Sequence, residues 1–257
     1  MILSPDFVKA IVARLKAEEP TLEAVLLAGS YARQEADEHS DVDVVAVTRD
    51  EPAVPYSAWY VPDAGGRLVH VSIAAERLER ADEADEEPAP WALGFPVLEV
   101  QTYLWRTSEA ERVLGADPSG SLPPGTPELE DFVDLYMKVR RAAGSGDEVI
   151  LRWAARLLGE YGVGLLRPLN PEVVVRSPVE AVRAALALTV TPAHFREDFE
   201  SCTGLNASSD GVVAAAASRL AREMMAFLQP HSAKLGLDDA TVEAALREGV
   251  LARYAGF

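Results

Sequence analysis

The sequence predicts an α+β protein in which a first part that alternates helices with strands is followed by a part built of helices only. Short apolar runs with strand character alternate with helical spacing in the first 106 residues, and only helical spacing recurs after residue 127. The run 115–127 between the two parts is rich in Gly, Pro and Ser. With 257 residues, 49% of them apolar, the chain is long enough for two domains with cores of their own. We therefore expect one domain over residues 1–115 and a helical domain over residues 126–257.

The elements of the first part follow from local patterns. Apolar side chains at helical spacing predict a helix over residues 7–18, which Pro20 ends. Strands are expected at residues 22–28, 41–47, 67–73 and 97–106, and shorter helices at residues 31–36 and 74–80. The remaining stretches are expected to be a proline-containing loop at residues 52–62 and a solvated acidic linker at residues 82–88.

The second part shows helix starts as well as helical spacing. Thr126-Pro127 predicts one start, since threonine is a good N-cap and proline fits the first helical position. Asp147 predicts the N-cap of the next helix. Further helices are expected at residues 178–188, 192–201, 210–228 and 238–254. The side chains of Trp91, Trp105 and Trp153 are expected in the cores.

The charge of the chain restricts its partners. Lys and Arg number 24 and Asp and Glu number 41, so the formal net charge is −17. Such a surface repels phosphate backbones, which argues against DNA or RNA as a substrate. It attracts a polycationic small molecule, although acidity that only keeps the protein soluble is an equally good explanation.

The compartment is suggested by what the sequence lacks. A single cysteine, Cys202, cannot form a disulfide within the chain, which favours a reducing compartment. The first residues have neither the basic stretch nor the apolar run of a signal peptide, and the alanine-rich run 212–217 is too short to cross a bilayer. We expect a cytoplasmic protein with no membrane partner, and the sequence leaves a homodimer open.

One segment carries a specific combination of chemical groups. Gly29 follows a predicted strand and lets a ligand approach the backbone, because it has no Cβ. Ser30 then lies at a helix start, where its hydroxyl and the free N–H groups can bind an anion such as triphosphate. Asp41 and Asp43 lie two positions apart on the next predicted strand and so point to the same face. Paired carboxylates are ligands for Mg²⁺ or Mn²⁺, and a phosphate site facing them suits phosphoryl or nucleotidyl transfer.

This segment, Gly-Ser followed by ten residues and then Asp-x-Asp, resembles the signature of the DNA polymerase β-like nucleotidyltransferase superfamily. In layout the chain is most similar to bacterial adenylyltransferases of aminoglycoside antibiotics, of the streptomycin and spectinomycin type. The resemblance implies a small mixed-sheet nucleotidyltransferase domain followed by an all-helical bundle. It further implies that Gly29 and Ser30 hold the β and γ phosphates and that Asp41 and Asp43 are catalytic metal ligands.

The resemblance also implies an activity. We expect transfer of a nucleoside monophosphate, AMP from ATP, with Mg²⁺ or Mn²⁺, to a hydroxyl of a small cationic molecule such as an aminoglycoside, and hence a role in antibiotic resistance. The alternative is an antitoxin-like protein adenylyltransferase or a catalytically silent nucleotide-binding protein.

One position departs from the family's pattern. Relatives carry a third carboxylate on the next core strand, where this chain has His70. Alternation puts Val69, Val71 and Ile73 on the buried face and His70 on the other. Three interpretations stay open. His70 is a general base, since imidazole titrates near neutral pH; or it marks a silent protein; or it is a bystander. In the last case Glu76, Asp131 or Asp134 supplies the carboxylate.

Lys138 is the candidate residue of the helical part. Related enzymes send a basic residue from this helix to the triphosphate. The alternative is a solvated charged face, because acidic residues stand at helical offsets from Lys138.

Overall fold

The computed structural model describes residues 3–37, 40–52, 54–62, 66, 68–81, 88–237 and 240–256. The chain forms two compact units, of which the first comprises Met1–Glu87 and Leu98–Leu122 and the second comprises Pro88–Val97 and Pro123–Phe257. The second unit therefore takes in a ten-residue segment that precedes the last part of the first unit. The composition of the chain does not indicate that the polypeptide passes from the first unit to the second and back again.

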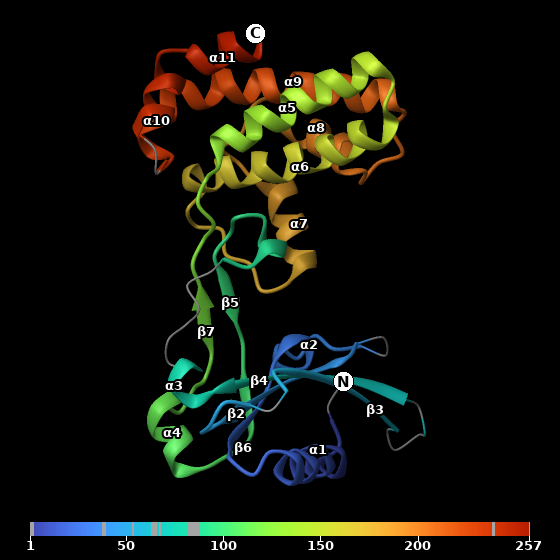
Figure 1. Ribbon diagram of the computed structural model, residues 1–257, viewed down its shortest axis with the longest axis vertical. Coiled ribbons are helices and arrows are strands. Elements are labelled where there is room, and N and C mark those ends of the chain that lie inside the picture. Colours follow the sequence, from blue (N-terminus) through green and yellow to red (C-terminus); the bar gives the residue numbers. More distant parts are fainter. Residues whose placement is uncertain are drawn as a thin grey trace. The chain divides into compact units, whose positions relative to one another are not determined.

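The first unit is built on a five-stranded mixed sheet with the strand order β3-β4-β2-β1-β6 (Figure 1). The pair β2–β4 is parallel, and the pairs β1–β2, β1–β6 and β3–β4 are antiparallel. The strands are β1 (Leu22–Leu27), β2 (Val42–Thr48), β3 (Tyr56–Pro62), β4 (Leu68–Arg77) and β6 (Thr102–Arg106). Two short strands, β5 (Val97–Glu99) and β7 (Gly120–Leu122), pair separately. The prediction of a mixed sheet followed by helices is confirmed.

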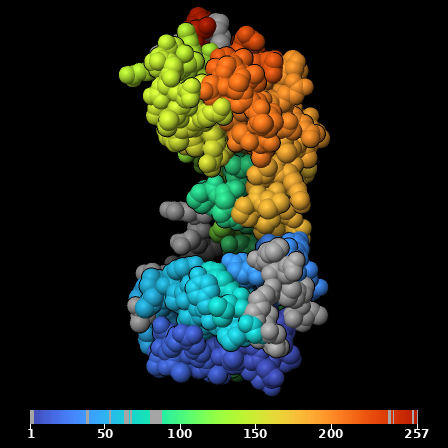
Figure 2. Space-filling model, turned by 90° about the vertical axis from the view of Figure 1, so that its right-hand side faces the viewer, coloured from blue at the N-terminus to red at the C-terminus, as the bar shows by residue number. Residues whose placement is uncertain are grey.

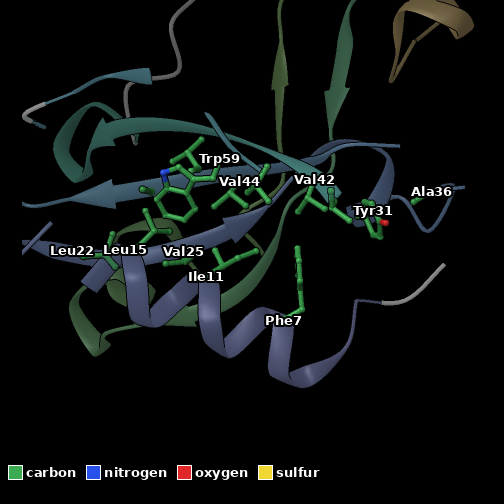
Figure 3. Packing of buried hydrophobic residues seen from close by; sticks show 14 residues of the cluster. Phe7, Ile11, Leu15, Leu22, Val25, Tyr31, Ala36, Val42, Val44 and Trp59 are labelled. Carbon is green, nitrogen blue, oxygen red and sulfur yellow. The ribbon is translucent and has the colours of Figure 1, made fainter. Parts of the chain in front are cut away.

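One face of the large sheet is covered by α1 (Pro5–Glu18). The side chains of Phe7, Ile11 and Leu15 point from this helix onto the sheet (Figure 3). Pro5 at the first position and the Ser4 hydroxyl, which accepts a hydrogen bond from the Phe7 N–H, start the helix. The buried sheet residues that complete this core are Val25, Val42, Val44, Ala46, Trp59, Val69, Val71 and Ile73.

The other face of the sheet is covered only in part. A second, smaller core joins Ala24, Leu26 and Val47 to α3 (Leu78–Ala81) and α4 (Ser108–Leu114). These helices pack at the end of the sheet where β2 and β4 finish. At the opposite end, where β2 and β4 begin, this face bears Asp43 and His70.

Strand β3 corrects the sequence prediction, which placed a loop at residues 52–62. Its burial alternates, with Trp59 buried and its neighbours Ala58 and Tyr60 exposed. Prolines did not prevent the strand because Pro55 precedes it and Pro62 ends it, and β3 lies at the edge of the sheet, where a missing N–H costs little.

Other boundaries in the first unit also differ. The short helix α2 covers Gly29–Ala32 instead of residues 31–36, and β2 begins after Asp41. β4 continues to Arg77, so α3 holds only four residues where a helix over 74–80 was expected. The strand expected at 97–106 is divided into β5 and β6. The acidic linker lies almost wholly outside the described residues.

The second unit is helical, as expected (Figure 1). Its core is formed where α5, α6, α8 and α9 pack on one another. The α-helices are α5 (Leu129–Ser145), α6 (Glu148–Leu166), α7 (Pro178–Ala187), α8 (Phe195–Thr203), α9 (Asp210–Leu228), α10 (Ala240–Arg247) and α11 (Val250–Ala255), with 3₁₀ turns at Pro90–Ala92, Arg167–Leu169 and Gln229–Lys234. In the described part of the chain, none of the helices has the length and apolar character needed to span a bilayer.

The helix starts of this unit test two predictions. Asp147 caps α6 as predicted, because its carboxylate accepts from the Ile150 N–H at 3.1 Å. The start predicted at Thr126-Pro127 is wrong: α5 begins at Leu129, and the first helical hydrogen bond runs from the Phe132 N–H to the Glu128 carbonyl. The helix expected at 238–254 is interrupted at Gly249, whose φ of 68° is incompatible with a continuing helix.

The tryptophans are less buried than expected. Trp105 packs against the core of the first unit, but Trp91 and Trp153 are exposed. The one tryptophan within a core is Trp59, in the strand that the sequence prediction missed.

Candidate functional site

The turn after β1 leads directly into the one-turn helix α2. Gly29 adopts a φ of 61°, which is the left-handed region, and the Ala32 and Arg33 N–H groups donate back to the carbonyls of Ala28 and Gly29. The Ala28 N–H donates to the Asp43 carbonyl at 2.9 Å, so the turn is attached to β2. Gly29 and Ser30 therefore lie beside the first residues of β2, as the sequence pattern predicts.

Gly29 and Asp43 are closely apposed. A Cβ placed on Gly29 would lie 1.9 Å from the Oδ2 atom of Asp43, far inside van der Waals contact. The glycine thus serves two needs, a positive φ and room for a carboxylate against the turn. This contact brings the candidate phosphate-binding turn and a candidate metal ligand into one site.

The two carboxylates influence each other. Asp43 lies on β2 between the buried residues Val42 and Val44, and Asp41 stands just before the strand. Burial raises the pKa of Asp43, and the negative charge of Asp41 raises it further, while the positive charges of Arg33 and His70 act against both effects. The two carboxylates therefore repel each other, and a bound cation would relieve that repulsion.

His70 lies where the alternation of β4 predicts. Val69, Val71 and Ile73 are buried and His70 is on the opposite face. Its Nδ1 atom lies 3.6 Å from the Oδ2 atom of Asp41. In the parallel pairing of β2 with β4, Asp43 is opposite Ser72, so His70 lies at the level of Asp41.

Glu76, one of the alternatives for the missing carboxylate, is not in this site. It lies opposite Val47 at the far end of β2. It is six positions along the strand from His70, which corresponds to about 20 Å. His70 is accordingly the ionisable side chain that β4 contributes beside Asp41.

The sequence interpretation missed two tyrosines on β3. In the antiparallel pairing of β3 with β4, Tyr60 is opposite His70, and the two rings are in tilted contact with centroids 5.2 Å apart. The Tyr56 hydroxyl and the Ser72 hydroxyl are 3.1 Å apart. Figure 2 shows β3 and β4, in light blue to cyan, at the surface of the first unit. Alternation around Trp59 was a signal that could have identified this strand.

Arg33 was missed as well. It follows α2, its side chain is only 12% exposed, and its Nε donates to Glu35 at 2.9 Å. Its charge counteracts the raised pKa of Asp43. A guanidinium beside the turn adds positive charge to the candidate phosphate site.

A divalent cation such as Mg²⁺ requires oxygen ligands. Among the described residues, no three His, Cys, Asp or Glu side chains are grouped closely enough to form a complete metal site. Mg²⁺ usually takes one or two protein carboxylates and completes its shell with water and substrate phosphate oxygens. Asp41 and Asp43 fit this mode, because they are two mutually repelling carboxylates beside a turn suited to phosphate.

Lys138 lies in the second unit, on α5. Its Nζ atom is 2.6 Å from the carboxylate of Asp134 one turn earlier, and 5.8 Å from the ring centroid of Trp153. This is the helical ion pair that was the alternative interpretation. A role at the triphosphate stays a prediction.

The second unit also contains a hollow of about 490 Å³ at the start of α5. It combines three carboxylates with apolar side chains, so it can accept a cation that carries apolar surface. The lining residues are Thr126, Pro127, Glu128, Leu129, Glu130, Asp131, Leu237 and Val242. Close by, burial and the negative charge of Glu128 raise the pKa of Tyr161.

Two family models match successive parts of the chain. Residues 8–109 match the family model of the nucleotidyltransferase domain, and residues 128–229 match that of the nucleotidyltransferase substrate binding domain. Among solved structures, a nucleotidyltransferase-like protein from Exiguobacterium sibiricum 255-15 is similar at 11% identity and a TM-score of 0.40, covering 97% of this chain and 90% of that chain. No curated protein matches the chain.

Proposed function

Since the chain belongs to the nucleotidyltransferases, with a nucleotidyltransferase domain and a substrate-binding domain, we propose that it transfers AMP from ATP to a hydroxyl group of a small cationic molecule. The acceptor oxygen bonds to the α phosphorus, the bond from that phosphorus to the bridging oxygen breaks, and pyrophosphate leaves with the electron pair. The proton of the hydroxyl passes to a base in the site.

Each residue of the site has a role in this proposal. Gly29, Ser30 and the backbone N–H groups of α2 bind the β and γ phosphates, and Arg33 adds charge there. Asp41 and Asp43 hold Mg²⁺ or Mn²⁺, which when bound neutralises phosphate charge. His70, 3.6 Å from Asp41, is the candidate base.

The observation that carries the proposal is the contact between Gly29 and Asp43. A phosphate-binding turn and a metal-binding carboxylate separated by thirteen other residues come so close that only glycine fits. A purely structural turn does not require a carboxylate there, and burial raises the pKa of that carboxyl, which is unfavourable without a cation.

Calorimetric titration of ATP with and without Mg²⁺ tests the donor and metal. We expect binding at least tenfold tighter with Mg²⁺ in the wild type, and Asp43→Asn to lose most of that difference, because an amide is a poorer ligand for a hard cation. Asp50→Asn is the matched control, since Asp50 follows the opposite end of β2. Equal ATP affinity in Mg²⁺ and in EDTA would contradict the assignment.

The cationic acceptor is supported by charge. The chain has a net charge of −17, and Asp41 and Asp43 add negative charge at the site itself. Incubation of aminoglycosides and lincosamides with labelled ATP should yield at least one adenylylated product.

The role of His70 is tested by two substitutions. As the base, His70→Ala should lower turnover about a hundredfold and leave ATP binding nearly intact. His70→Glu restores the carboxylate of the relatives and should keep or raise turnover. A His70→Ala variant as active as the wild type would make His70 a bystander and leave Asp131 and Asp134 to be tested.

A second candidate function rests on the same position. His70 in place of the relatives' carboxylate also fits a silent nucleotide-binding protein or an antitoxin-like adenylyltransferase of a partner protein. If the protein is catalytically silent, we expect no turnover by the wild type and measurable turnover by the His70→Glu variant. Labelling of a co-expressed protein, with no small molecule modified, would favour the antitoxin-like function.

A further inference from the structure

We propose that the exposed surface of β3 and β4 binds the acceptor, with Tyr60 as the main contact for its ring. This surface, called the acceptor face, consists of Tyr56, Ala58, Tyr60, His70 and Ser72. The inference rests on the proposed nucleotidyl transfer and identifies the acceptor as a cation that presents a saturated ring.

The order of the strands places this face beside the carboxylates. From the phosphate-binding turn, the sheet runs through β2 with Asp43, then β4 with His70 and Ser72, then β3 with the tyrosines. Neighbouring strands are about 4.8 Å apart, so β3 lies about 10 Å from β2. The turn and the acceptor face therefore flank Asp41 and Asp43 on opposite sides.

The geometry of the reaction then indicates on which side of the carboxylates the pyrophosphate and the acceptor each lie. Nucleotidyl transfer proceeds in line, so the attacking hydroxyl approaches the α phosphorus opposite the departing pyrophosphate. With pyrophosphate on the side of Gly29, which contacts Asp43, the acceptor approaches from the side of β4 and β3.

Both tyrosines of the acceptor face expose most of their surface to solvent. Tyr60 is 70% exposed and Tyr56 is 60% exposed, whereas Trp59 between them is buried. Their positions are nevertheless set, because Tyr60 contacts the His70 ring and Tyr56 shares a hydrogen bond with Ser72. Ala58 lies between them on the same face, where it is exposed and pairs with Ser72.

The chemistry of the face indicates its ligand. The face of a tyrosine ring binds apolar ring surface and attracts cations, and the nearby Asp41 and Asp43 add negative charge. An acceptor with a saturated ring and an ammonium group is held by both interactions. The ring then lies on Tyr60 while a hydroxyl group reaches the carboxylates.

Calorimetry tests the acceptor face directly, with a non-hydrolysable ATP analogue and Mg²⁺ present. The probes are kanamycin A, a ring-bearing cation; spermine, a cation without a ring; and methyl α-glucoside, a neutral ring. We expect kanamycin A to bind most tightly, and Tyr60→Ala to weaken it about tenfold, the effect expected for losing a desolvated cation–π contact. Tyr60→Phe keeps the ring face and should stay within about twofold.

Two further variants separate local effects from misfolding. Ala58→Leu fills the space between the tyrosines without removing a contact of the core, and should weaken kanamycin A at unchanged ATP affinity. Tyr56→Phe removes only the hydrogen bond to Ser72 and should have a smaller effect than Tyr60→Ala. Thermal unfolding of each variant verifies that the sheet is intact.

The outcomes distinguish this inference from the proposed function. If kanamycin A fails to bind the wild type, or binds Tyr60→Ala and Ala58→Leu as tightly as the wild type, the acceptor face is overturned even if AMP transfer is observed. If binding depends on Tyr60 but no aminoglycoside is ever adenylylated, the acceptor face stands and the proposed transfer fails.

Discussion

At the scale of single residues, the site depends on Gly29, because a side chain at this position would collide with Asp43. Gly29 has both a positive φ and a neighbouring carboxylate oxygen 1.9 Å from where its Cβ would be. A larger residue would have to move either the turn or Asp43. Both are parts of the proposed site, so a substitution here affects function before it affects the fold.

We predict that Gly29→Ala lowers nucleotidyl transfer at least a hundredfold, because the added methyl displaces Asp43. The left-handed backbone alone costs about 1–2 kcal/mol of stability. Gly66→Ala is the matched control: Gly66 has a φ of 80° but no atom within 4 Å of its Cβ position, so it should show the backbone cost without loss of activity. Equal activity of the two variants would contradict this account of Gly29.

Cys202 is the residue whose reactivity the structure fixes most directly. It is buried in α8, and burial, with a smaller contribution from the Asp198 carboxylate, raises the pKa of its thiol to about 12. The thiol therefore stays protonated in the folded protein over the neutral range, which makes it a poor nucleophile.

Two measurements check that the thiol of Cys202 is protonated in the folded protein. With a thiol reagent at pH 8, the native protein should react orders of magnitude more slowly than the denatured protein, where Cys202 is an ordinary thiol. Because the folded pKa is the higher one, stability is lost as pH rises from about 9 towards 12, by up to about 1.4 kcal/mol per unit. Cys202→Ala should lack this part of the loss, and an equal loss in both would refute the assignment.

At the scale of elements, an ion pair joins α8 to α9. The Asp198 side chain is fully buried, and the Arg219 guanidinium donates to both of its carboxylate oxygens, from Nε at 3.0 Å. Burial raises the pKa of Asp198 and the charge of Arg219 opposes that rise. The pair therefore fixes how the two helices pack, but only while both partners are present.

We predict that Arg219→Ala destabilises the protein by about 2–3 kcal/mol, at the low end for a broken buried pair because the guanidinium is 39% exposed. Removing the guanidinium raises the pKa of Asp198 further. The contribution of Asp198 to the stability of the variant is then greatest below about pH 4, where the carboxyl is protonated in both states, and it falls as pH rises. Denaturation at pH 5 and pH 8 should show a smaller deficit at pH 5.

Arg196→Ala is the control for this prediction. Its pair with Glu200 lies on the same helix but is exposed, and should contribute less than about 0.5 kcal/mol at either pH. A deficit of Arg219→Ala that is the same at both pH values would mean that the buried carboxylate is not its cause.

At the scale of the whole molecule, the net charge of −17 acts on any charged ligand that approaches. A field of this sign accelerates the association of a cation and is screened by salt, with a Debye length of about 10 Å at 0.1 M. The same field opposes ATP, so the proposed binding of ATP depends on local contacts at the Gly29–Ser30 turn.

We predict that kcat/KM for a cationic acceptor falls several-fold between about 0.05 and 0.5 M salt, because screening removes the attraction. The KM of ATP with Mg²⁺ should rise less or even fall over the same range. Steady-state kinetics with the concentration of one substrate varied at a time measures both. A kcat/KM independent of salt would show that the net charge serves solubility alone.

The sequence by itself determined most of the elements, though not β3, and the candidate side chains of the proposed site. Gly29, Ser30, Asp41 and Asp43 could be identified because a strand, a turn and a second strand follow each other within a short segment, where local rules apply. The same alternation placed His70 on the correct face of β4. Asp147 was identified as a cap because capping involves only neighbouring residues.

Only the tertiary structure decided what depends on pairing between distant segments. The sequence pattern did not show that Gly29 leaves room for Asp43, that β3 pairs at the edge next to β4, or that Tyr60 lies against His70. It also misplaced Trp153 in the core, since helical spacing does not tell which side of a helix its neighbours cover. Register and burial arise from contacts between residues far apart in the chain, and a pattern read along one segment contains no record of its partner.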